Sequence, residues 1–139
     1  MGSNASPSIS YGIVVYEDGI LNEDEMNEKF VEFVDEEGDL DNYWAFANGE
    51  DPIDMSFLER RDYNDKNPLP YEVLNFGCDG YDGWILHVPG THFRGEDFSA
   101  TNFTLPELDE VKLKRFEDFL KEHVGGTEKP DWILSVSYG

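Results

Sequence analysis

Apolar residues follow a strand-like spacing in some segments of this chain and a helix-like spacing in others. The order of these segments limits the fold more than any single motif does. Over residues 9–16 apolar side chains alternate with others, which predicts a strand with one apolar face. Over residues 23–36 and 105–123 they recur at intervals of three and four, which predicts two amphipathic helices. Short runs of strand-forming residues predict further strands at residues 43–47, 71–76, 84–88 and 132–138.

The predicted order of elements is β-α-β, an insertion, and then β-β-α-β. Strands that are apolar mainly on one face suit a largely antiparallel sheet with two main helices on one face, so the expected fold class is α+β. The ferredoxin-like arrangement is the closest simple match to this order, with an insertion at about residues 48–69. Residues 9–139 are expected to form a single α+β domain, preceded by a leader (residues 1–8) that is disordered or derived from an expression vector.

Capping residues predict where the two helices begin. Asn22 is a candidate N-cap for the first helix, with Glu25 three residues later as in a capping box. Thr104 stands in the same way before the second helix, with Pro106 and Glu107 following it. We therefore expect the helices to start next to these two residues.

The charge of the chain restricts its partners. The formal net charge is -21, from 31 acidic and 10 basic residues among 139. Such a charge repels phosphates and anionic lipid, so direct binding to nucleic acid or to a membrane is not expected. It allows three kinds of partner, namely a basic protein surface, metal cations or a cationic small molecule, and of these we expect a basic protein.

The expected location is the cytoplasm. The single cysteine, Cys78, cannot form an intramolecular disulfide, so the chain does not need an oxidising compartment. No apolar run is long enough to span a membrane, and the first residues do not have the pattern of a secretory signal.

Residues 17–54 hold most of the negative charge, with fifteen acidic residues and one basic residue, Lys29. Because the first predicted helix has an apolar stripe, its carboxylates should project together from the opposite face. Carboxylates along one face can imitate the phosphates of a nucleic acid and occupy a basic groove; a solvated helix face in an acidic proteome would give the same pattern. The candidate partner-binding residues are Glu23, Asp24, Glu25, Glu28, Glu32, Asp35, Glu36, Glu37, Asp39 and Asp41.

The predicted hairpin and the loop after it contain residues that a different kind of site would use. His87 and His92 are the best candidates for catalytic bases near neutral pH. Asp79 and Asp82 are candidates for binding a hard cation, although turn formation explains them as well, and Arg94 adds a cation. No metal site and no cofactor is expected, because no set of three or four convergent ligands is visible.

These observations favour a small acidic binding protein over an enzyme. The chain has no Gly-x-Ser-x-Gly elbow and no Walker-type phosphate loop. In its sharpest form the hypothesis is a viral or mobile-element protein that mimics a nucleic acid and inhibits a protein that binds one. Two alternatives stay open: a small enzyme or ligand-binding domain with its site at residues 77–94, and a structural or assembly subunit.

Overall fold

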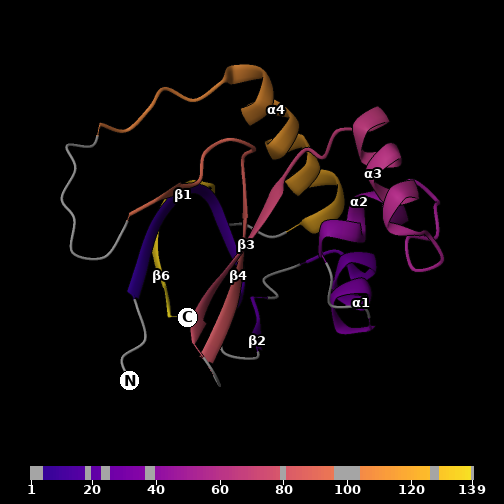
Figure 1. Cartoon of the computed structure of the whole chain (residues 1–139), viewed down its shortest axis with the longest axis horizontal. Helices are drawn as coiled ribbons and strands as arrows, with labels where there is room; N and C mark the ends of the chain where they lie inside the picture. Colours follow the sequence, from indigo (N-terminus) through magenta and orange to yellow (C-terminus); the bar gives the residue numbers. More distant parts are fainter. Residues whose placement is uncertain are drawn as a thin grey trace.

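A computed structural model of the chain describes residues 5–17, 20–22, 26–36, 40–78, 81–95, 104–125 and 129–138. The fold is mixed α+β, with one mostly antiparallel sheet packed against helices (Figure 1). The strands are β1 (Ala5–Glu17), β2 (Ile20–Leu21), β3 (Glu72–Cys78), β4 (Tyr81–His87), β5 (Phe93–Arg94) and β6 (Asp131–Tyr138). The α-helices are α1 (Glu28–Glu36), α2 (Tyr43–Ala47), α3 (Phe57–Lys66) and α4 (Glu110–Phe119), and two short turns of other helix types are η1 (Leu40–Asn42) and η2 (Leu120–Val124).

The first strand organises the sheet. One half of β1, residues 5–12, pairs with β6, and the other half, residues 12–17, pairs with β4; both pairings are antiparallel. Figure 1 shows β1 as a bent ribbon that passes from one partner to the other. Gly12 lies at the change of partner, and a Cβ there would overlap the carbonyl oxygen of Leu86. The bend therefore needs a residue without a side chain at this position.

The four long strands lie in the order β6-β1-β4-β3, with antiparallel neighbours. Each β-α-β unit is thus split by a strand of the other unit, as the ferredoxin-like arrangement requires. A parallel bridge between Gly77 and Ser137 also joins β3 to β6, so the pairings return on themselves. That arrangement has no such bridge, so the ferredoxin-like description stays a prediction.

The two main helices pack on one face of the sheet, as the sequence predicts. Ile13 of β1 and Leu86 of β4 are opposite each other and point to the same side. Their side chains belong to one buried cluster with Phe30 of α1 and Phe116 of α4. Burial of a phenylalanine of this kind contributes about 2 to 3 kcal/mol, so these contacts hold both helices against the sheet.

Residues 43–47 form the helix α2, so the strand predicted there is wrong. An apolar run of five residues does not by itself distinguish a buried strand from a buried helix. Contacts with Tyr71 favour the helix here. The hydroxyl of Tyr71 accepts a hydrogen bond from the backbone N–H of Trp44 at 3.2 Å and donates one to the carbonyl oxygen of Leu40. These two bonds hold η1 and the start of α2 in a helical path.

Both predicted N-caps are also wrong. The first helix begins at Glu28, where the side chain of Asn27 accepts a hydrogen bond from the N–H of Lys29 at 2.9 Å. Asn22 instead bonds to the backbone of β1, donating from its side chain to the carbonyl oxygen of Val14 at 2.9 Å; its supposed partner Glu25 lies outside the described residues. The carboxylate of Asp109 caps α4 by accepting from two backbone N–H groups, which leaves residues 104–109 outside the helix.

Two other segments contain more regular structure than the sequence pattern predicts. The insertion contains the helix α3, capped by Ser56, and none of the residues of this helix is buried. Residues 5–8, expected in the leader, are the first residues of β1, whereas residues 1–4 lie outside the described residues. In the described part of the chain, no helix is long and apolar enough to cross a membrane.

Candidate functional site

The carboxylates of α1 share one face of the helix. Phe30, Phe33 and Val34 are buried on the inner face. The outer face presents the exposed side chains of Glu28, Glu32, Asp35 and Glu36, which we call the acidic surface. Like charges four residues apart on a helix destabilise it by about 0.2 to 0.5 kcal/mol per pair. The pattern therefore costs stability, and nothing in the packing of α1 requires it.

The carboxylates of the acidic surface form no ion pair in the described part of the chain, although Lys29 lies on the same helix. No lysine, arginine or histidine described there forms an ion pair with these four carboxylates. The helix α4 differs, because Lys114 and Asp118 form a pair at 2.9 Å. Asp41 is exposed in η1, while five further candidates lie outside the described residues: Glu23, Asp24, Glu25, Glu37 and Asp39.

A hollow of about 330 Å³ adjoins the acidic surface, between α1 and the segment that follows α2. We call it the acidic hollow. Its carboxylates come from Glu32 and Glu36 of α1 and from Glu50 and Asp51. Its apolar lining consists of Phe33, Phe46, Pro52 and Ile53.

The apolar lining of the acidic hollow is partly open to solvent. Phe33 and Pro52 are buried, but Phe46 is 42% exposed and Ile53 is 62% exposed. The ring of Phe46 packs against the ring of Phe33 with centroids 5.0 Å apart. The hollow thus offers apolar surface bordered by negative charge.

A larger hollow, about 630 Å³, lies at the start of α1. Its charged lining is mixed, because Glu28 and Glu122 face the same space as Lys29 and His123. Tyr43 also lines it, and burial raises the pKa of this phenol to about 12, so the hydroxyl stays protonated at neutral pH. With charges of both signs, this hollow does not select one class of ligand by charge.

The two histidines of the predicted hairpin site lie close together. The rings of His87 and His92 have centroids 5.9 Å apart; His87 is 2% exposed and His92 is exposed. The Nδ1 atom of His87 lies 3.0 Å from the carbonyl oxygen of Val88, which fits an N–H donor, and Nε2 lies 4.0 Å from the carboxylate of Glu72. We call His87 and the residues bonded around it the His87 cluster.

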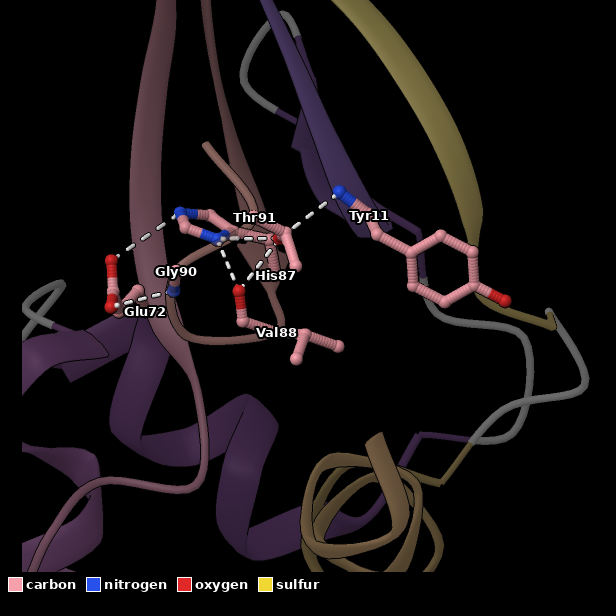
Figure 2. Close-up of polar contacts among 6 residues, drawn as sticks. All are labelled: Tyr11, Glu72, His87, Val88, Gly90 and Thr91. Atoms are coloured by element: carbon pink, nitrogen blue, oxygen red, sulfur yellow. Dashed lines mark hydrogen bonds and ion pairs between the residues drawn. The ribbon is translucent and has the colours of Figure 1, made fainter. Parts of the chain in front are cut away.

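The His87 cluster fastens the turn after β4 to two neighbouring strands, as Figure 2 shows. The hydroxyl of Thr91 donates to the carbonyl oxygen of Val88 at 2.7 Å and accepts from the backbone N–H of Tyr11 at 3.2 Å. The carboxylate of Glu72 accepts from the backbone N–H of Gly90 at 3.2 Å.

Burial is the main influence on His87 and lowers its pKa, because the charged form loses its hydration. The bond to the carbonyl oxygen of Val88 and the charge of Glu72 act in the opposite direction, and His92 adds to the lowering. His87 is therefore neutral at pH 7.

The other residues named for this site are placed apart from it. Asp82 is exposed near the hairpin turn, opposite Gly77, at the other end of β4 from His87. Arg94 donates to the hydroxyl of Ser6 at 2.6 Å. Asp79 lies outside the described residues. Among the residues that the structure describes, no three histidine, cysteine or carboxylate side chains are grouped to hold a metal ion.

The apolar part of the acidic hollow and the partners of His87 do not follow from the sequence pattern. The pattern predicts a strand at Phe46 and an insertion at Ile53. Glu72 and Thr91 carry no motif, since their roles depend on the pairing of β3 with β4 and on the turn after β4. Comparisons with protein-family models, curated proteins and solved structures found no match to this chain.

Proposed function

We propose that this chain is a small acidic binding protein that acts through protein–protein interaction, with the acidic surface of α1 against a basic partner. The observation that carries the proposal is the row of four exposed carboxylates, none of which forms an ion pair with a described residue. A basic partner would supply positive charge and relieve the repulsion within α1. In its sharpest form the partner is a nucleic-acid-binding protein in the cytoplasm, which the chain inhibits by mimicking a nucleic acid, as a viral or mobile-element protein would.

The alternative of a ligand site at residues 77–94 has less support. The polar groups of the His87 cluster bond to one another, and the imidazole is almost completely buried. A ligand would have to displace those bonds, whereas the acidic surface is already open to a partner.

The test is capture of proteins from a native lysate at low salt, followed by elution in rising salt. We expect a basic protein that is released as salt rises, and that is also released when double-stranded DNA is added as competitor. The variant Glu28→Gln/Glu32→Gln should weaken capture by about fivefold to thirtyfold, since each of the two exposed charge pairs contributes up to about 1 kcal/mol. The matched control Glu107→Gln/Glu110→Gln removes two exposed carboxylates near the start of α4 and should have little effect.

Equal loss in the two double variants would show that net charge, and not the acidic surface, determines binding. Retention of the captured protein in high salt would contradict the proposal directly.

A further inference from the structure

The acidic hollow combines two properties that a purely electrostatic surface does not need. Four carboxylates surround it, and two of its apolar side chains, Phe46 and Ile53, remain open to solvent. Exposed apolar side chains close to a concave surface are a feature of protein-binding sites. Figure 1 places α1 and α2 at the end of the molecule away from β6, so the sheet does not cover this region.

The chemistry of the hollow restricts its occupant. Its carboxylates are not grouped as a metal site in the described part of the chain, which argues against a divalent cation. A neutral apolar ligand would leave the carboxylates facing it without counter-charge. A second copy of this chain would bring a net charge of -21 against the same surface and would be repelled.

An arginine side chain satisfies both properties at once. Its methylene groups and the face of its guanidinium can lie on an aromatic ring, here Phe46, while its N–H groups pair with carboxylates in two directions. Glu32 and Glu36 are four residues apart on α1 and so are neighbours on its surface. Glu50 and Asp51, in the segment after α2, also line the hollow, and the carboxylate of Asp51 accepts a hydrogen bond from the backbone N–H of Ile53 at 3.2 Å.

We propose that the acidic hollow is the specificity pocket for an arginine side chain, presented by a basic segment of the partner protein. This inference rests on the proposed function and adds the residue type that is recognised and the pocket that recognises it. The rest of the acidic surface then attracts the partner at long range, while the hollow selects arginine at contact.

The experiment uses the full chain and a defined probe, the peptide acetyl-Ala-Arg-Leu-Arg-Ala amide, followed by two-dimensional NMR at low salt. We expect the peptide to shift the amide signals of Phe46 and Ile53. The same peptide with citrulline in place of arginine keeps the shape without the charge and should bind at least about tenfold more weakly. The lysine version should bind more weakly than the arginine version, because an ammonium group cannot pair with two carboxylate oxygens in parallel.

Protein variants separate the hollow from the wider surface. Phe46→Leu keeps an apolar contact with Phe33 but removes the aromatic face, and Ile53→Ser removes exposed apolar surface; each should weaken the peptide about threefold to fivefold. Glu32→Gln/Glu36→Gln should weaken it further, whereas Glu28→Gln, on the same helix but outside the hollow, should change it less than twofold.

Unchanged affinity in both Phe46→Leu and Ile53→Ser would overturn the inference. If Glu28→Gln/Glu32→Gln nevertheless weakened capture of the partner from the lysate, the proposed function would stand without the pocket. Spermidine or Ca²⁺ shifting the same signals at lower concentration than the peptide would also overturn it, since the hollow would then be a site for free cations.

Discussion

The His87 cluster and the acidic hollow are both built from polar and apolar side chains, but they differ in whether the polar groups are bonded within the protein. In the His87 cluster, side-chain and backbone atoms bond to one another across three segments of chain. In the acidic hollow, carboxylates face solvent beside exposed apolar surface. Buried polar groups that are fully bonded specify a fold, whereas an open set of like charges contributes nothing to it. The bonded groups of the first region support a structural role, and the open carboxylates of the second agree with the role in recognition that we propose.

The largest effect on stability should come from Thr91→Val, which keeps the shape of the side chain and removes its hydroxyl. The backbone N–H of Tyr11 would lose the partner that it has at 3.2 Å. We expect the free energy of unfolding to fall by about 2 kcal/mol, measured by urea denaturation at pH 7.5. Thr91→Ser, which retains the hydroxyl, should lose much less. A loss below about 0.5 kcal/mol in Thr91→Val would mean that the cluster does not stabilise the fold.

A smaller effect should follow from the titration of His87. Its pKa is lowered in the folded protein, so below about pH 6.5 the unfolded chain binds the proton more readily. The contribution of the neutral imidazole is therefore complete above pH 6.5 and is lost as the pH falls toward the folded pKa, by at most about 1.4 kcal/mol per pH unit.

The measurement for His87 compares the urea stability of the wild type with that of His87→Gln at pH 7.5, 6.0 and 5.0. The difference between the two proteins should shrink as the pH falls, because glutamine does not titrate. The carboxylates titrate in both proteins, so the comparison removes their contribution. A constant difference across the three pH values would show that His87 binds a proton equally well in both states.

The smallest effect should come from the acidic hollow itself. Glu32→Gln/Glu36→Gln removes charges that repel each other and Glu28 along α1, so stability should change by no more than about 0.5 kcal/mol, toward greater stability. Asp118→Asn breaks the pair with Lys114 in α4 and should shift stability by a similar amount in the opposite direction. A loss of stability in the α1 variant would indicate that the hollow has a structural role.

The sequence predicted those elements whose periodicity is long enough to identify. The two amphipathic helices and four of the predicted strands are present, and both helices pack on one face. Residues 43–47 were misassigned because Tyr71, 24 residues beyond their end, selects the helix by hydrogen bonding. The predicted helix starts are wrong because Asn27 and Asp109 are equally suitable capping residues. Which residue caps each helix depends on the tertiary structure.

The candidate site was predicted in part for the same reason. The outward carboxylates of α1 follow from the apolar stripe opposite them, so Glu28, Glu32, Asp35 and Glu36 could be named from the sequence. Phe46 could not, because its exposure depends on α2 being a helix. The bonds around His87 depend on strand register, which one sequence does not define.

The pairing of β1 with β6 has a consequence for how the protein folds. Residues 5–12 meet residues 131–138, so this ladder joins segments more than 100 residues apart in the chain. Closing so long a loop is costly in entropy, and folds dominated by such distant contacts reach the native state slowly. During synthesis, the hydrogen-bonding groups along this edge of β1 stay unpaired until β6 has left the ribosome.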